Sequence, residues 1–328
     1  MKASLSAVEV VTVTLNPAID QTVTIPNFDA GKVNRVEHSR SDPGGKGVNV
    51  ASILADAGHS VAVTGFLGRD NVAPFEDLFA RKQIVDQFVR IAGQTRVGIK
   101  ISDPVDQQTT DINFPGQAPA AADAEALMRT LETLDGAWFV LSGSIPPGLD
   151  ASIYRTLVAA VKARGRKVLL DTSGEGLRLA LEVAPHVIKP NVQELEALLG
   201  QRLADEDAIV AAVQPLQERG VELVAVSMGS RGACFVSDST VVTARPPRVD
   251  VKSTVGAGDA MVAGIIAGQL RGATLSACAR LATAFALDAI THIGSGLSSP
   301  SAIDELIPRV TVEERRREVE HAAGHQAL

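Results

Sequence analysis

Short apolar runs rich in β-branched residues recur along the chain and alternate with stretches of helical spacing. The runs lie at residues 8–15, 61–67, 137–141, 167–170, 186–188 and 222–226. The helical stretches, rich in Ala, Leu and Glu, lie at residues 49–57, 121–134, 152–163 and 205–219. Strands that are apolar on both faces and alternate with helices predict a parallel sheet covered on each side. Right-handed crossovers make that sheet doubly wound, and binding groups then collect at the carboxyl ends of its strands.

Two stretches depart from this α/β pattern. Residues 21–40 and 95–114 alternate with period two and have short polar connections. In the second stretch, Val97, Ile99 and Ile101 share one face of the predicted strand. We expect antiparallel strands with one covered face, inserted into the α/β body either as an ordinary edge hairpin or as a flap over the active site.

Composition narrows the class of protein. The 328 residues allow two domains or one large α/β unit, and the net charge of −7 argues against general affinity for nucleic acid or anionic membranes. Aromatic residues make up only 3% of the chain, which leaves few rings for stacking bases or sugars. Two cysteines without metal spacing fit a reduced compartment, and no run approaches the roughly 20 apolar residues of a membrane span. We therefore expect a cytoplasmic protein without nucleic-acid or membrane partners.

The segment Gly256-Ala257-Gly258-Asp259 opens a stretch of small apolar residues that predicts a buried helix. The glycines permit a tight turn whose N–H groups point into one concavity, and a helix start attracts anions. Asp259 could then remove a proton from an attacking hydroxyl, or it could simply stabilise the helix dipole as a first-turn acid. The chain has no Walker A sequence, so any phosphoryl transfer needs a different scaffold.

A second glycine-rich segment, residues 43–51, precedes another predicted helix. Gly44 and Gly45 allow a phosphate or sugar to approach the backbone, while Lys46 and Asn49 face a ligand at the helix start. Upstream, Asp20 lies just past the first predicted strand. It could hold sugar hydroxyls or form an Asx turn.

Three more polar segments follow predicted strands. Asn191 and Glu194 could form a capping box, or Glu194 could reach Mg²⁺ through water. Residues 227–232 offer small residues against a nucleotide phosphate, and residues 142–147 offer hydroxyls beside a Pro-Pro turn. Their common position at strand carboxyl ends predicts one binding site.

The motifs TLNPAID, GGKGVNVA, GFLGRDN, DTSGE, KPNVQE, SMGSRG and STVGAGD, across about residues 8–305, resemble the ribokinase-like PfkB carbohydrate kinase family in order and spacing. The phosphosugar kinase branch is the most similar. Within it, GFLGRDN, TRVGIKI and TDINFPG resemble the 1-phosphofructokinases most.

The resemblance implies a doubly wound, mostly parallel sheet flanked by helices and a small β-sheet lid. We expect one kinase domain over residues 1–312, with the lid formed by about residues 20–43 and 94–116, and a charged helical tail over residues 313–328. The resemblance also implies ATP and Mg²⁺ as cofactors and a homodimer that forms through the lid.

Site roles follow from the same resemblance. Asp259 is the implied base, and Gly256, Ala257 and Gly258 form the implied anion hole. The implied substrate residues are Asp20, Gly44, Gly45, Lys46, Asn49, Ser144 and Arg96, the last as a clamp on the substrate phosphate. The implied nucleotide and metal residues are Lys189, Asn191, Glu194, Ser227, Gly229, Gly232 and Thr254, together with Gly256 and Gly258.

The implied activity is ATP-dependent phosphorylation of fructose 1-phosphate to fructose 1,6-bisphosphate. The same machinery could act on tagatose 6-phosphate or fructose 6-phosphate. A sugar-phosphate sensor that keeps the fold without catalysis is a third alternative, which the intact set of Asp259, Asn191 and Glu194 disfavours.

Overall fold

A large, mostly parallel sheet organises the chain in the computed structural model, which describes residues 7–106, 108–292, 294 and 296–317. Its strands run in the order β15 (Thr311–Arg316), β14 (Thr240–Arg245), β13 (Ala233–Val236), β12 (Leu223–Ser227), β11 (Val187–Ile188), β10 (Lys167–Asp171), β9 (Gly136–Ser142), β1 (Val8–Thr14), β4 (Val61–Gly68) and β5 (Val85–Asp86), with β6 (Val89–Ile91) beside β4. The strands from β12 to β5 pair in parallel, and β13, β14 and β15 are antiparallel. The predicted doubly wound α/β class is confirmed.

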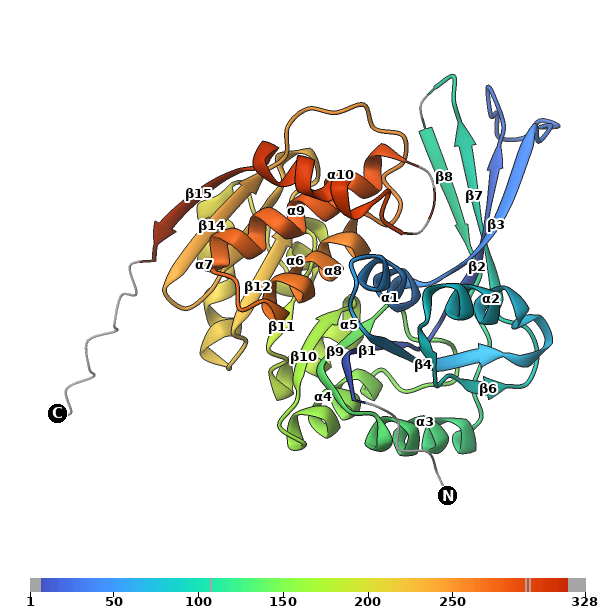
Figure 1. Cartoon of the computed structure of the whole chain (residues 1–328), viewed down its shortest axis with the longest axis horizontal. Coiled ribbons are helices and arrows are strands. Elements are labelled where there is room, and N and C mark those ends of the chain that lie inside the picture. The colour runs from blue at the N-terminus through green and yellow to red at the C-terminus, as the bar shows by residue number, and fades with distance from the viewer. Residues whose placement is uncertain (1–6, 107, 293, 295, 318–328) are drawn as a thin grey trace.

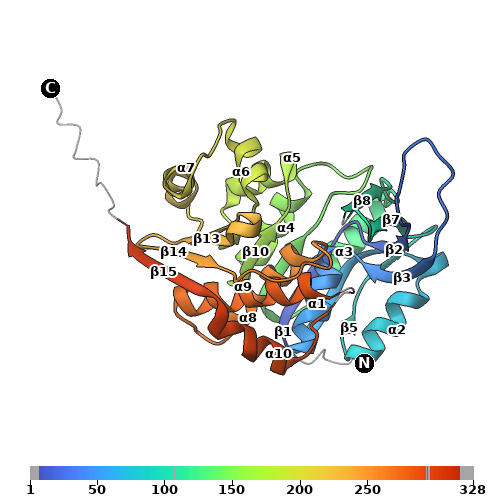
Figure 2. The same cartoon turned by 90° about the horizontal axis from the view of Figure 1, so that it is seen from above.

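Helices cover both faces of this sheet (Figure 2). One face carries α1 (Lys46–Asp56), α2 (Ala73–Lys82), α8 (Ala257–Leu270), α9 (Leu275–Thr291) and α10 (Pro300–Leu306). The other face carries α3 (Ala121–Thr133), α4 (Ile153–Ala163), α5 (Gly174–Ala180), α6 (Val192–Leu199) and α7 (Glu206–Glu218). Val10 and Val11 of β1 are both fully buried on opposite faces, which explains why the strands read as continuous apolar runs.

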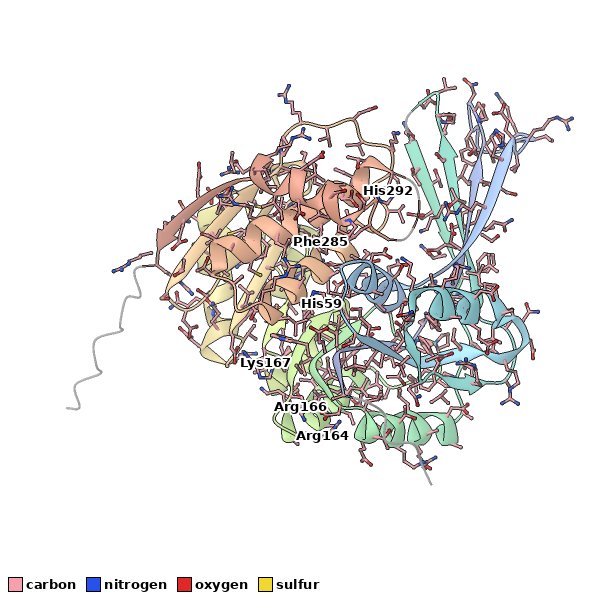
Figure 3. The ribbon with its side chains drawn as sticks, viewed as in Figure 1. His59, Arg164, Arg166, Lys167, Phe285 and His292 are labelled. Atoms are coloured by element: carbon pink, nitrogen blue, oxygen red, sulfur yellow. The ribbon has the colours of Figure 1, made fainter. Side chains whose placement is uncertain are left out.

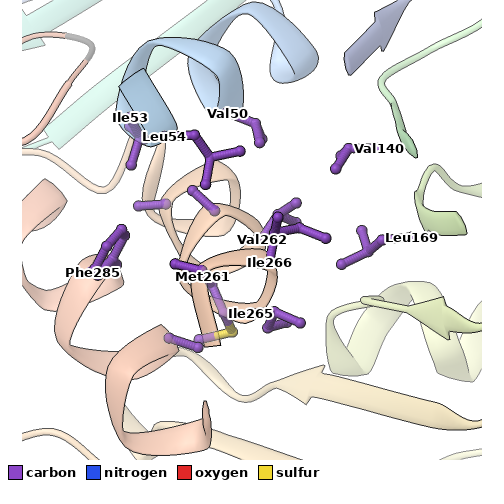
Figure 4. Packing of buried hydrophobic residues seen from close by; sticks show 14 of the residues in the cluster. Val50, Ile53, Leu54, Val140, Leu169, Met261, Val262, Ile265, Ile266 and Phe285 are labelled. Carbon is purple, nitrogen blue, oxygen red and sulfur yellow. The ribbon is translucent and has the colours of Figure 1, made fainter. Parts of the chain in front are cut away.

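Helix α8 lies inside the molecule, as its small apolar residues predict. Val262 and Ile266 of α8 pack toward Leu54 of α1 and Leu169 of the sheet (Figure 4). Each such buried side chain contributes roughly 1.5–3 kcal/mol to folding. Gly264 allows α9 to approach closely, since a Cβ there would lie 2.5 Å from the Cα of Ala282. This packing holds the first turn of α8, and therefore Asp259, in a rigid position.

A second sheet, the lid, stands apart from the α/β body (Figure 1). Its order is β3 (His38–Gly44), β2 (Ala18–Thr24), β7 (Arg96–Asp103) and β8 (Gln108–Asn113). The predicted stretches do form an inserted sheet, but β2 and β7 pair in parallel, so the expectation of antiparallel strands throughout is wrong. The reason is topological: β2 follows β1 and β7 follows β6, and these body strands all point toward the same edge of the main sheet.

The charged C-terminal segment differs from the prediction. Residues 313–316 belong to β15, which pairs antiparallel with β14, so the predicted helical tail is wrong for these residues and the sheet continues past the expected boundary at 312. Without β15, the N–H and C=O groups along one side of β14 would lack partners. Residues 318–328, which include His321 and His325, lie outside the described residues. None of the helices described by the structure is both long and apolar enough to cross a membrane.

Candidate active site

The N-terminus of α8 lies at the carboxyl edge of the main sheet and carries Asp259. Gly256 caps the helix with φ of +81°, a conformation that glycine adopts without strain. The first turn of a helix leaves its N–H groups without intrahelical acceptors, so Ala257 and Gly258 can donate to an anion. Asp259, only 7% exposed, is the third residue of the same turn. The predicted anion hole and the candidate base are therefore contiguous.

Burial raises the pKa of Asp259 to about 6. The ammonium groups of Lys46 and Lys189 oppose this rise, the Asp171 carboxylate adds to it, and a hydrogen bond from Asn49 lowers the pKa. In that bond the Asn49 Nδ2 donates to the Asp259 Oδ2 across 2.7 Å. A carboxylate with a pKa near 6 is ionised at neutral pH yet basic enough to accept a proton in a transition state.

Two lysines and an aspartate lie beside Asp259. The Asp171 Oδ1 is 3.2 Å from the Lys46 Nζ and 3.4 Å from the Lys189 Nζ. Burial alone would lower the pKa of Lys46, but the carboxylates of Asp171, Asp259 and Glu194 outweigh it and raise that pKa. Both lysines are among the predicted site residues, and Asp171 is not. Its position directly after an apolar strand was the signal that could have identified it.

A small cavity of about 80 Å³ separates the lid from the body. Asp20, Asn49, Lys100 and Gly256 are among its lining residues, as are Lys252, Gly294 and Gly296. Burial raises the pKa of Asp20, and the nearby charges of Lys100 and Arg96 oppose the rise. The Lys100 Nζ lies 3.8 Å from the Asp20 Oδ2. Lys100 was not among the predicted site residues, although its alternation with Val97, Ile99 and Ile101 places it on the same strand face as Arg96.

Glycines make room for Asp20 on both neighbouring lid strands. A Cβ on Gly44 would lie 2.6 Å from the Asp20 Oδ2, and a Cβ on Gly98 would lie 2.7 Å from its Oδ1. Gly45 has φ of +109°, and a Cβ there would lie 2.9 Å from the Cα of Pro17. Gly44 and Gly45 thus serve close packing around the predicted sugar site.

Arg96 and Ser144 lie at the base of the lid. The guanidinium of Arg96 donates to three backbone carbonyls: Nε to Pro17 at 3.3 Å, Nη1 to Phe114 at 3.0 Å and Nη2 to Asn16 at 3.2 Å. The Asn16 Nδ2 donates to the Ser144 Oγ at 3.1 Å. Arg96 therefore ties the lid to the body, and two of its five N–H groups are left for a ligand.

Gly294 and Gly296, which follow α9, line the small cavity, and a buried acid holds described residues on either side of them. Asp288 accepts a hydrogen bond from the Ser298 N at 3.0 Å and lies 3.3 Å from the His292 Nε2. Figure 3 shows Phe285 within α9 and His292 at its end. These contacts shape the cavity wall from the side opposite the lid.

A larger cavity of about 710 Å³ lies on the other side of the Gly256–Asp259 turn. Its predicted nucleotide residues are Asn191, Ser227, Gly229, Gly232, Thr254 and Gly258, joined by Ala257. Apolar side chains that include Val251, Met261, Leu287 and Ile290 complete the wall. Because Gly256 lines the small cavity while Ala257 and Gly258 line the large one, the turn lies between the two cavities. This arrangement suits transfer of a group from one ligand to another.

Asn191 and Glu194 form the capping box that the sequence allowed. The Glu194 N donates to the Asn191 Oδ1 at 2.7 Å, and the Asn191 N donates to the Glu194 Oε2 at 2.8 Å. Within the part of the chain that the structure describes, no group of three or more His, Cys, Asp or Glu side chains is arranged to hold a metal ion. Glu194 nevertheless fits Mg²⁺ chemistry, because a carboxylate has about four lone-pair sites and Mg²⁺ usually takes one or two carboxylates plus substrate phosphates and water.

A ribokinase-like fold with a glycine-rich helix start between two cavities, beside a buried aspartate, is that of a carbohydrate kinase, a phosphotransferase with an alcohol acceptor. The sequence matches the description "pfkB family carbohydrate kinase" over residues 9–302. The chain belongs to this family. Membership of this kinase family implies ATP as the phosphoryl donor.

Relatives and solved structures agree with this assignment. The chain is 49% identical to a 1-phosphofructokinase from Rhodobacter capsulatus over 93% of this chain and 97% of that one. It resembles a possible 1-phosphofructokinase from Thermotoga maritima with a TM-score of 0.84 and 31% identity, covering 94% of this chain and 100% of the other. It also resembles the tetrameric inhibited form of phosphofructokinase-2 from Escherichia coli with a TM-score of 0.84 and 29% identity, covering 92% of this chain and 98% of the other.

Proposed function

We propose that this protein transfers the γ-phosphate of ATP to fructose 1-phosphate and forms fructose 1,6-bisphosphate. The observation that carries the reaction type is the buried Asp259, which Asn49 holds beside the helix start that lies between the small and the large cavity. The choice of substrate is supported by the 1-phosphofructokinase from Rhodobacter capsulatus, which is nearly half identical over almost its whole length.

Asp259 takes the proton of the acceptor hydroxyl as the new bond to phosphorus forms. The N–H groups of Ala257 and Gly258 stabilise the charge on the transferring phosphoryl group, and the ammonium groups of Lys46 and Lys189 add to that stabilisation. Phosphoryl transfer depends mainly on positioning and charge stabilisation, so one base is sufficient.

The acceptor lies against the lid in this proposal. Asp20 holds sugar hydroxyls, with Asn49 on the opposite side of the small cavity and Gly45 and Lys46 at the start of the same helix as Asn49. Arg96 uses its two remaining N–H groups to bind the substrate phosphate. The lid excludes water from the transferring group and so limits hydrolysis of ATP.

The nucleotide and its phosphates bind to Lys189, Asn191, Ser227, Gly229, Gly232 and Thr254. Glu194 and Asn191 would hold Mg²⁺, either directly or through water. An ion held there would neutralise part of the charge of the ATP phosphates.

The lid also supports a homodimer. Val36, Ile112 and Phe114 are 51%, 45% and 47% exposed on lid segments, an unusual display of apolar side chains for a sheet with a solvent-facing edge. Phosphofructokinase-2 from Escherichia coli has a tetrameric inhibited form. We propose that two copies of this chain pair through their lids. We also propose a cytoplasmic location.

An ADP-release assay with fructose 1-phosphate, fructose 6-phosphate and tagatose 6-phosphate tests the assignment. We expect the highest kcat/KM with fructose 1-phosphate. The similarity to phosphofructokinase-2 also allows a preference for fructose 6-phosphate. That result would change the assigned substrate and leave the proposed mechanism unchanged. Binding of all three sugars without ADP release would instead indicate a sensor.

A further inference from the structure

Asp171 is an acidic residue that the mechanism above does not use. It ends β10, its side chain is 1% exposed, and it lies at the carboxyl edge of the sheet, where the catalytic groups gather. A charged group so deeply buried is costly unless it is paired. Its contacts therefore indicate what it is for.

One carboxylate oxygen of Asp171 lies close to the ammonium groups of both Lys46 and Lys189. The Oδ1 lies 3.2 Å from the Lys46 Nζ and 3.4 Å from the Lys189 Nζ, whereas the Oδ2 has no hydrogen-bond partner among the described residues. Two ammonium groups at such short range repel each other, and the carboxylate between them offsets that repulsion. The cluster keeps one net positive charge beside the anion hole.

The two lysines come from different sides of the site. Lys46 is the first residue of α1, whose Asn49 contacts Asp259 on the side of the small cavity. Lys189 follows β11, and its Nζ lies 3.5 Å from where a Cβ on Gly258 would be, directly against the turn that lines the large cavity. Asp171 thus connects the acceptor side of the turn with the donor side.

The neighbouring strands hold Asp171 in a fixed place. Asp171 pairs in register with Ser142 of β9, and Ser142 pairs with Thr14 of β1. The side chains of all three are buried, and a Cβ on Gly47 at the start of α1 would lie 2.4 Å from the Thr14 Oγ1, so the helix sits directly on this row. A side chain on a packed parallel sheet is a rigid support for two flexible lysine chains.

We infer that Asp171 is a positioning residue, which holds the ammonium groups of Lys46 and Lys189 on the two sides of the Gly256–Asp259 turn so that both face the phosphoryl group during its transfer. The inference rests on the proposed kinase mechanism at this turn. It assigns Asp171 no contact with either substrate. Its effect passes through the two lysines and through their influence on Asp259.

The test compares Asp171→Asn with the unsubstituted protein on whichever sugar phosphate that protein phosphorylates. If the unsubstituted protein phosphorylates none, the proposed function fails before any variant is made. The amide keeps the size of the side chain, removes its charge and turns one possible donor toward the ammonium groups. We expect kcat to fall about 100-fold, a loss typical of misplaced charge stabilisation, with less change in either KM. Asp86→Asn, which removes a carboxylate paired with Arg90 away from the site, is the matched control and should keep kcat.

Two readouts separate positioning from a purely structural role. The acid limb of the pH profile of kcat/KM should move to lower pH in Asp171→Asn, because Asp171 raises the pKa of Asp259. The losses caused by Asp171→Asn and Lys46→Met should also be strongly sub-additive in the double variant. Unchanged kcat, or additive losses with an unchanged pH profile, would overturn the inference.

Asp171→Glu covers the case in which Asp171→Asn does not fold. It keeps the charge but moves the carboxylate by about 1.5 Å, one C–C bond. Misplacement on this scale can cost about 100-fold in rate, so we expect a kcat loss of at least tenfold in a folded protein. A folded Asp171→Glu enzyme with undiminished kcat would reject the positioning role.

Discussion

Asn49 donates a hydrogen bond from its Nδ2 to the Asp259 Oδ2 over 2.7 Å and so joins the first turn of α1 to the first turn of α8. Both helices begin at glycine-rich turns on the same face of the main sheet. The bond orients the carboxylate of the proposed base and stabilises its ionised form. It also connects the proposed sugar site to the proposed anion hole.

Replacement of the base should abolish turnover while the nucleotide still binds. Asp259→Asn keeps the shape of the side chain and a partner for Asn49, but an amide cannot accept the proton of the sugar hydroxyl. We expect kcat to fall by about 10²–10⁴, the usual contribution of a general base. Steady-state kinetics and calorimetric ATP binding measure the two effects. Near-normal turnover would show that another group accepts the proton.

The pH profile should report the ionisation of Asp259. Because its pKa is raised to about 6 and the ionised form is the active one, kcat/KM should fall as the pH decreases through about 6. Asn49→Ala removes a hydrogen bond that lowers this pKa, so the acid limb should move to higher pH. Asn34→Ala, which removes three hydrogen bonds within the lid loop, with Asp29 and Lys32, is the matched control. An acid limb that stays in place in Asn49→Ala would contradict this assignment.

Asp259 should also limit the stability of the folded protein. A folded-state pKa of about 6 against an ordinary 3.8 means that Asp259 destabilises the fold as the pH rises between these values, and the full effect is present above about 6. At 1.36 kcal/mol for each pKa unit, the cost is about 3 kcal/mol. Asp259→Asn should therefore raise Tm by several degrees at pH 8 and leave it nearly unchanged below pH 4. Thermal unfolding at both pH values measures this, and equal shifts at the two would count against it.

Arg96 should affect the sugar phosphate more than the nucleotide. Arg96→Ala removes the proposed phosphate contact and three hydrogen bonds that tie the lid to the body, so we expect KM for the sugar phosphate to rise at least tenfold with a much smaller change for ATP. Arg96→Lys keeps the charge without the planar fork. Its KM for the sugar phosphate should therefore lie between those of the unsubstituted protein and Arg96→Ala. Equal changes in both KM values would show that Arg96 acts only on the lid as a whole.

Local sequence pattern determined most of the architecture. Apolar runs such as residues 61–67 and 222–226 predicted strands that the structure contains, because burial on both faces of a parallel sheet favours nearly continuous apolar runs. The glycine-rich starts of α1 and α8 were equally readable, since only glycine tolerates the backbone at Gly45 and Gly256 without strain. The motifs at strand ends also predicted which segments meet, because parallel strands end at one edge.

Tertiary structure decided what depends on neighbours distant in the chain. Residues 313–316 carry a charged pattern that suits a helix, yet they form a strand because β14 offers an unpaired edge. β2 and β7 pair in parallel because the preceding strands, β1 and β6, end at the same edge of the main sheet. Period-two alternation within a strand carries no information about this. The contact of Asp171 with both lysines is the clearest case. Lys46 is 125 positions from Asp171, and Lys189 follows a different strand from Asp171. Only packing in a low-dielectric interior makes their charges depend on one another.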